Sequence, residues 1–177
     1  MILQHWGARA EEISDDVAGD SLCPDARLVA TRCISIDAAP EVVFAFIRQM
    51  GLGRAGWYSY DLIDNLARKS ATTIHPEWQD VTAGSTVPAG PVSFVAAVVE
   101  PPRVFVLQVP TSRMCFTLAY EARAEGTGTR LVTRLRARLS FPGGRIIEHL
   151  LLGPGDGIMV RRQLLNLKMR CEAGTVA

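Results

Sequence analysis

Several residue types are scarce or evenly balanced in this sequence, and each shortage excludes a class of protein. The chain of 177 residues carries 19 Lys and Arg against 18 Asp and Glu, a net charge of +1. A general binder of nucleic acid or of anionic membranes needs an excess of positive charge on one face, so we expect neither. No apolar run approaches the roughly 18 to 20 residues that cross a bilayer, which argues against stable membrane insertion.

Histidine and cysteine are also scarce. Three histidines and four cysteines are present, at positions 5, 75 and 149 and at positions 23, 33, 115 and 171. Their spacing fits no metal site, and no G-x-S-x-G motif is present, so we expect no metal, no cofactor and no recognisable catalytic set. The N-terminal residues lack the pattern of a secretory signal. We therefore expect a cytoplasmic protein whose cysteines are buried thiols rather than two disulfides.

Length and composition predict one globular domain with an extra arm. Apolar residues make up 48% of the chain and charged residues 21%, which is typical of a soluble globular protein. Residues 1–26 are acidic and weakly patterned, so we expect an N-terminal arm packed on the domain. Residues 27–177 are expected to form that single domain.

Hydrophobic periodicity predicts the secondary structure. A period of two predicts strands and a period near 3.6 predicts helices. Strands are expected at residues 28–37, 93–100, 103–109, 113–124 and 129–141, and helices at 40–50, 57–69 and 145–173, the last interrupted at 153–157. Pro40 suits a helix start, and Gly51 suits a helix end. The helix at 57–69 depends on Tyr58, Leu62 and Leu66, which are spaced four residues apart.

The order of these elements predicts an α+β fold. Helices and strands fall in separate parts of the chain, which favours an antiparallel sheet over βαβ units. We expect a curved antiparallel sheet wrapped around the long C-terminal helix, with two shorter helices after the first strand. If the sheet curls around that helix, the facing side chains need not fill the space between them, so a cavity is expected.

Four stretches carry a resemblance to a known superfamily. They are residues 5–8, residues 31–44, the string RAGWYSYD within residues 49–61, and residues 159–168. In these stretches the sequence resembles the SRPBCC superfamily, the START-like or helix-grip proteins that include polyketide cyclase/dehydrase-like and lipid-transfer members, and specifically a bacterial branch. The resemblance implies a cavity between the sheet and the C-terminal helix that holds a lipid-like, aromatic or polyketide-like molecule. It implies no shared catalytic residues.

Aromatic residues are only 7% of the chain, yet two of the three Trp and two of the three Tyr lie within residues 57–78. Large rings with polar tips often line a cavity, although ordinary core packing is the alternative. The candidate ligand-binding residues are Trp57, Tyr60, Asp61, Trp78, Phe116, Leu118, Tyr120, Leu131, Thr133, Leu135, Asp156, Met159, Val160 and Leu164.

Three further motifs have a structural and a functional interpretation. Residues 51–56 match G-x-G-x-x-G, but no second parallel strand follows, so a tight turn is favoured over nucleotide binding. Asp156 is expected to cap the last helix, with a role at the cavity mouth as the alternative. A row of arginines on the strand at 129–141 is expected to be a solvated sheet face; it comprises Arg130, Arg134, Arg136 and Arg138. One of Arg161 and Arg162 could reach inward to a ligand carboxylate.

The sequence thus predicts a cofactor-free protein that binds a hydrophobic or amphipathic small molecule. The alternative is a cyclase or dehydratase in which Tyr60 or Tyr120 donates a proton and Asp61 or Asp156 acts as base. A third hypothesis is a protein-interaction module that uses the acidic arm. The sequence does not indicate the oligomeric state or the identity of the ligand.

Overall fold

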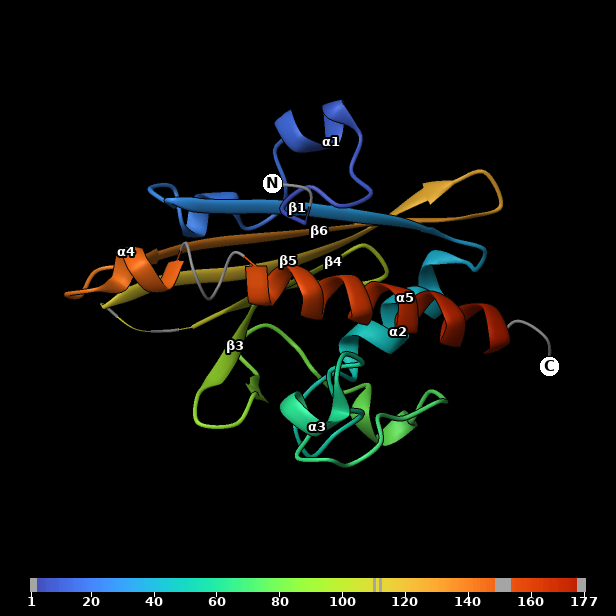
Figure 1. The fold of residues 1–177 in the computed structure, drawn as a ribbon. Helices are drawn as coiled ribbons and strands as arrows, with labels where there is room; N and C mark the ends of the chain where they lie inside the picture. The colour runs from blue at the N-terminus through green and yellow to red at the C-terminus, as the bar shows by residue number, and fades with distance from the viewer. Residues whose placement is uncertain (1–2, 110, 112, 149–153, 175–177) are drawn as a thin grey trace.

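The computed structural model describes residues 3–109, 111, 113–148 and 154–174, and it shows one twisted sheet with a long helix along one face (Figure 1). The six strands are all antiparallel to their neighbours, in the order β1-β6-β5-β4-β3-β2. They are β1 (Leu28–Ile36), β2 (Thr86–Pro88), β3 (Ser93–Glu100), β4 (Val104–Gln108), β5 (Met114–Glu125) and β6 (Gly128–Leu139). The predicted α+β class and the antiparallel sheet are confirmed.

The helices are short except for the last. They are α1 (Ala10–Ser14), α2 (Pro40–Arg48), α3 (Asp61–Asp64), α4 (Gly144–Ile147) and α5 (Gly157–Ala173), with 3-10 turns η1 (Asp20–Leu22) and η2 (Pro76–Trp78). The interruption expected at 153–157 falls partly on residues 149–153, which lie outside the described residues. No helix in the described ranges is long and apolar enough to cross a membrane.

Alternation along β6 gives the sheet two chemically different faces. Leu131 and Leu135 point to the inner face, which we define as the face that α5 and α2 cover, and both are buried. Helix α5 contributes its apolar stripe to the same core; the stripe comprises Val160, Leu164, Leu167 and Cys171, all buried as the spacing predicts. Full burial of one such leucine stabilises the fold by roughly 1.5 to 3 kcal/mol.

The sheet bends at β3, and this bend leaves room beside α5. The pairing of β3 with β4 shifts register between Ala96 and Val98. A bulge of this kind bends its strand and increases the local twist. In Figure 1, β3 accordingly runs at a steep angle to β1 and turns toward the segment that contains α3.

The predicted helix at 57–69 is wrong, because only α3 forms there. The apolar spacing that suggested it does not describe one buried face: Tyr58 is fully buried, whereas Leu62 and Leu66 are 79% and 69% exposed. Tyr58 and Leu66 also have positive φ angles, which a right-handed helix does not allow. Gly56 precedes this segment with φ +79, and a Cβ there would collide with Ser70.

The prediction of a solvated arginine row is wrong for Arg130 and Arg134, which are buried, whereas the Arg138 side chain is 38% exposed. Residues 3–26 cross the outer face of the sheet, opposite α5, and cover this row. Arg130 donates to both carboxylate oxygens of Glu12, at 2.7 and 2.8 Å. Arg134, whose side chain is 3% exposed, donates to Asp20 at 2.8 Å and to three backbone carbonyls of the arm. The acidic arm and the basic row are two halves of one internal interface, which the sequence showed only separately.

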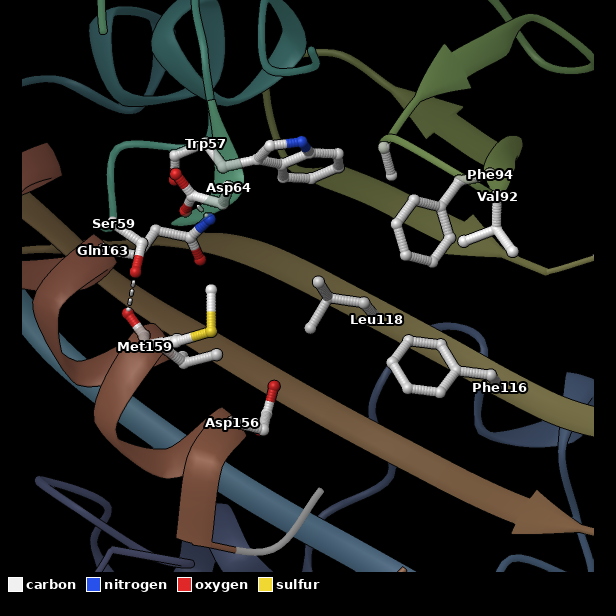
Figure 2. Close-up of a pocket in the computed structure, with 12 residues that line it drawn as sticks. Trp57, Ser59, Asp64, Val92, Phe94, Phe116, Leu118, Asp156, Met159 and Gln163 are labelled. Carbon is white, nitrogen blue, oxygen red and sulfur yellow. Dashed lines mark hydrogen bonds between the residues drawn. The ribbon is translucent and has the colours of Figure 1, made fainter. Parts of the chain in front are cut away.

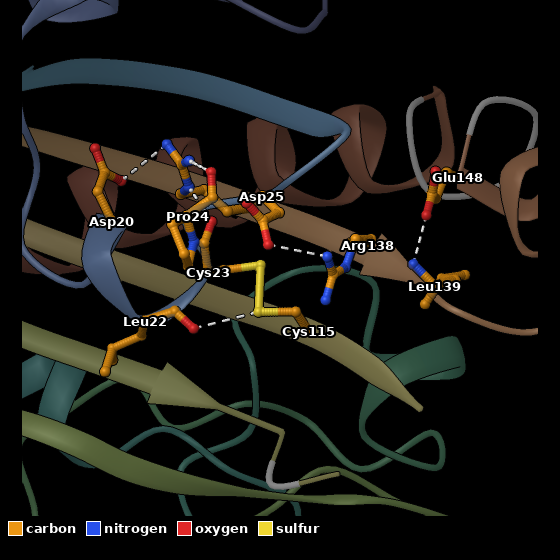
Figure 3. The surroundings of a disulfide bond; sticks show 10 residues. Asp20, Leu22, Cys23, Pro24, Asp25, Cys115, Arg138, Leu139 and Glu148 are labelled. Atoms are coloured by element: carbon orange, nitrogen blue, oxygen red, sulfur yellow. Dashed lines mark hydrogen bonds and ion pairs between the residues drawn. A yellow bond between two sulfur atoms is a disulfide. The ribbon is translucent and has the colours of Figure 1, made fainter. Parts of the chain in front are cut away.

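Two of the four cysteines form a disulfide, contrary to the prediction of buried thiols. Cys23 lies directly after η1 in the arm, and Cys115 lies on β5, with their Cα atoms 5.7 Å apart (Figure 3). The arm brings them together although 92 positions separate them. Cys33 and Cys171 are both buried, as expected. The cysteines therefore no longer support a reducing compartment, and a cytoplasmic location stays a prediction.

Candidate ligand pocket

A pocket of about 230 Å³ opens where the bent sheet, the start of α5 and the 57–64 segment meet (Figure 2). Eight apolar and four polar residues line it: Trp57, Ala89, Val92, Phe94, Phe116, Leu118, Met159 and Val160, with Ser59, Asp64, Asp156 and Gln163. Figure 2 shows side chains from three directions, with Met159 and Asp156 at the lower left, Trp57 above, and Phe94, Leu118 and Phe116 on the right. The pocket is therefore an apolar hollow with a few polar groups, the usual composition of a small-molecule site.

Aromatic rings form one wall of the pocket. Trp57 and Phe94 meet edge to face, with ring centroids 5.6 Å apart, and Phe94 lies 5.8 Å from Phe116. Such contacts hold rings in preferred orientations and contribute about 0.5 to 1.5 kcal/mol each beyond their burial. Val92, 49% exposed, stands at the edge of this wall. The wall offers flat faces to an apolar ligand.

Hydrogen bonds fix the 57–64 segment to α5. The Gln163 amide donates to the Trp57 carbonyl at 2.8 Å, and the Ser59 hydroxyl donates to the Met159 carbonyl at 3.0 Å. Tyr58 between them has φ +58, a strained conformation that sends its ring into the core. Trp57 and Ser59 consequently both line the pocket.

Asp156 lines the pocket, but its negative charge is paired with the positive charge of Arg32. Arg32 on β1 points to the inner face, is 1% exposed, and places Nη1 2.6 Å from the Asp156 carboxylate. Burial raises the pKa of Asp156, and the Arg32 charge opposes that rise. The Asp156 side chain makes no capping hydrogen bond to α5, so the capping prediction is wrong. The guanidinium draws the carboxylate away from the helix end.

Asp64 lies in the pocket without such a partner. Neither of its carboxylate oxygens, both buried, accepts a hydrogen bond from the described residues. Burial raises the pKa of Asp64 to about 6, and the negative charge of Asp61 adds to the rise. The dipoles of the nearby backbone and of Ser59, whose hydroxyl hydrogen goes to the Met159 carbonyl, offset only part of it. Asp64 is thus a pocket-lining carboxyl group whose oxygens are unsatisfied among the described residues.

The structure brings six of the fourteen predicted site residues into this pocket: Trp57, Phe116, Leu118, Asp156, Met159 and Val160. Five others are buried in the core beneath it: Tyr120, Leu131, Thr133, Leu135 and Leu164. The Tyr120 hydroxyl donates to Gln163 at 3.0 Å, and Thr133 donates to the Arg32 carbonyl at 3.0 Å. These hydroxyl groups therefore support the pocket floor.

Three predicted residues lie elsewhere. Tyr60 is 40% exposed, and its ring faces Arg162 at 6.0 Å. Asp61 accepts two hydrogen bonds from Ser70, at 2.5 and 3.2 Å, which hold a turn. Trp78 packs on His75 with ring centroids 4.4 Å apart. Clustering of aromatic residues in sequence did not reveal which rings share a cavity.

Sequence reasoning missed several residues, and only some left a signal. Asp64 belongs to the same polar segment as Asp61, and Phe94 belongs to a predicted strand. Arg32 left a clear signal, because a lone arginine on the apolar side of an alternating strand requires a buried partner. Arg161 and Arg162, the predicted inward candidates, are both exposed. Arg161 lies 5.4 Å over the Trp6 ring.

No family model matches the chain, and no curated protein sequence matches it either. Solved structures do match. The Aha1 dimer from Colwellia psychrerythraea aligns with a TM-score of 0.53 at 16% identity, over 82% of this chain and 97% of its own. The KanY protein aligns with a TM-score of 0.52 at 16% identity, over 81% of this chain and 97% of its own.

A third match is the di-domain ARO/CYC StfQ from the steffimycin biosynthetic pathway. Its TM-score is 0.54 at 11% identity, over 90% of this chain and 55% of StfQ. Identities this low establish a common fold and leave the activity open. All three share the arrangement described above, a sheet with a C-terminal helix packed across it. The chain therefore shares the fold of these solved structures, the α+β helix-grip arrangement that its sequence resemblance implied.

Proposed function

We propose that this protein binds a small hydrophobic or amphipathic molecule in the pocket between α5, β5 and the 57–64 segment. The observation that carries the proposal is the pocket itself, which Trp57, Phe94 and Phe116 line on one side. Apolar surface left unburied inside a fold costs free energy of roughly 25 cal/mol per Å², and a ligand recovers it.

The size of the pocket narrows the choice of ligand. A dry protein cavity of roughly 150 Å³ holds benzene. At about 230 Å³ this pocket accommodates a body of one or two fused rings, or a short alkyl chain, in the described conformation. A polyketide of several rings or a long-chain lipid needs more room than that. Among the predicted ligand classes, we therefore propose the smaller members, those with one or two rings or a short alkyl chain.

A cavity-filling substitution tests the proposal. Met159 lines the pocket, whereas Met169 on the same helix is 59% exposed. Met159→Trp fills the pocket and is expected to weaken binding of naphthylmethanol at least about tenfold, which corresponds to about 1.4 kcal/mol. Met169→Trp is the matched control and is expected to leave binding unchanged. Isothermal titration calorimetry gives both affinities. Equal binding by both variants, or no binding by the unaltered protein, would contradict the proposal.

A second candidate function is cofactor-free proton transfer, as in a cyclase or dehydratase, since StfQ is described as an ARO/CYC. The acid and base pairs expected from sequence do not support it, because Asp61 is bound to Ser70, and burial raises the pKa of Tyr120 above its usual range. Asp64 supports it, with a pKa near neutrality in an apolar pocket. Loss of turnover of an enolisable bicyclic ketone on Asp64→Asn, with the ligand still bound, is the expected result; unchanged turnover would refute it.

A further inference from the structure

We propose that the pocket selects a cation: a small apolar body that carries a protonated amine, with the ammonium group bound to Asp64. This inference rests on the proposed function, since it names the chemical class of the ligand for the same pocket. The amine class is not among the lipid-like, aromatic or polyketide-like ligands that the sequence resemblance implied.

The charged residues that line the pocket are acidic. The described residues around it include two carboxylates, Asp64 and Asp156, and none of them is Lys, Arg or His. Arg32 already neutralises Asp156 through a contact of 2.6 Å from beneath the pocket. One negative charge therefore remains without a counter-charge, at Asp64.

The Asp64 carboxylate lacks hydrogen-bond donors among the described residues. An ionised carboxylate accepts several hydrogen bonds in water, yet both oxygens of Asp64 are buried with none from the described residues. Leaving such a group unsatisfied costs free energy that a donor recovers. A protonated amine supplies the donors and the opposite charge in one group. A hydroxyl supplies one donor and no charge.

The aromatic wall suits the same ligand. Asp64 and Trp57 both line the pocket, and Figure 2 shows Leu118 and Phe116 on its other side. A ring or short chain can lie against these apolar residues while its ammonium group reaches Asp64. Trp57 also favours a nearby cation, because the face of an indole ring is electron-rich.

The same arrangement disfavours an anion. A ligand carboxylate in this pocket meets Asp64 with no basic lining residue to offset the repulsion. The buried Nη2 of Arg32 has no hydrogen-bond partner among the described residues, but Arg32 is not one of the residues that line the pocket. Fatty acids and carboxylated polyketides are accordingly expected to bind worse than neutral molecules of the same size.

Three probes with one apolar body test the inference: naphthylmethylamine, naphthylmethanol and naphthylacetate, titrated calorimetrically at about pH 7.5, where the amine is protonated. We expect the amine to bind about tenfold more tightly than the alcohol, and the acid to bind more weakly than the alcohol. In Asp64→Asn the amine and the alcohol should bind within about twofold of each other. Asp80→Asn, a matched charge change at a side chain that is 77% exposed, should keep the full preference.

The outcomes separate the two claims. Binding of the alcohol without any preference for the amine overturns the cation inference and leaves the proposed function standing. Tighter binding of the acid does the same. Failure of all three probes to bind overturns both. An amine preference that survives in Asp64→Asn while that variant keeps its cooperative thermal unfolding contradicts the assignment to Asp64.

Discussion

The two faces of this sheet handle charge in opposite ways. On the outer face the arm covers two arginines of β6. Arg130 binds the Glu12 carboxylate and one carbonyl oxygen, and Arg134 binds the Asp20 carboxylate and three carbonyl oxygens. On the inner face, Leu131, Leu135 and Ala137 of the same strand are apolar and share one core with the buried residues of α5. The inner charges are few: Arg32 with Asp156, and Asp64 without a partner.

This difference separates residues that hold the fold from residues that are free to act. A buried charge whose partners are complete contributes to a unique structure and offers nothing to a ligand. A buried charge whose partners are incomplete costs stability, and such groups gather at functional sites. By this criterion the arm interface is structural and the Asp64 pocket is functional.

The largest effect is expected from the inner ion pair. Arg32→Met leaves the Asp156 carboxylate buried beside apolar groups, and loss of one partner from a buried pair typically costs about 3 to 5 kcal/mol. Combining Arg32→Met with Asp156→Asn removes the stranded charge and should recover much of that loss. Urea denaturation measures both. A cost below about 1 kcal/mol for Arg32→Met would show that the pair is effectively solvated.

The outer face supplies the next prediction. Glu12→Gln removes the charge that Arg130 binds, where both side chains are about nine-tenths buried, and should cost about 2 to 3 kcal/mol. Arg9→Gln breaks a pair with Glu125 in which the Arg9 side chain is 51% exposed, and should cost less than about 1 kcal/mol. Equal losses of stability in the two variants would contradict the claim that the buried Arg130–Glu12 pair stabilises the fold more than the exposed Arg9–Glu125 pair.

The pH dependence of the Glu12 pair has a definite sign. Its hydrogen bonds from Arg130 lower the pKa of Glu12 from 4.5 to about 2. The folded state therefore binds the proton less readily than the unfolded state does. The stabilisation is complete above pH 4.5 and is lost as pH falls toward about 2. Glu12→Gln should flatten this part of the acid-denaturation profile, whereas Arg9→Gln should not.

The smallest predicted change in stability has the opposite sign. The pKa of Asp64 is raised from 3.8 to about 6, so its ionised form destabilises the folded state. Asp64→Asn should therefore stabilise the protein near neutral pH, by about 1 kcal/mol after allowing for partial exposure. The gain should be complete above pH 6 and vanish below about pH 4. Destabilisation at neutral pH would mean that Asp64 holds the fold.

The sequence predicted α5 and five of the six described strands, because periodicity reports which side of an element is buried; it missed the three-residue β2. It failed where contacts between distant residues decide the structure. Tyr58, Leu62 and Leu66 have helical spacing, yet positive φ at Tyr58 and Leu66 breaks the helix. The arm and the arginine row were each recognised, but their pairing spans more than 100 residues. The predicted site residues were partly right for the same reason. Residue spacing cannot distinguish a residue that lines the pocket, such as Phe116, from one buried in the core, such as Leu131.

The central claim, that the hollow beside α5 holds a ligand, is tested most directly by the indole signals of the three tryptophans. Trp57 lines the pocket, whereas Trp6 and Trp78 do not. In a titration with naphthylmethylamine followed by proton–nitrogen correlation NMR, we expect the Trp57 indole signal to shift saturably while those of Trp6 and Trp78 stay in place. A saturable shift confined to Trp78 or Trp6, or no saturable shift with any of the three naphthyl probes, would contradict the account.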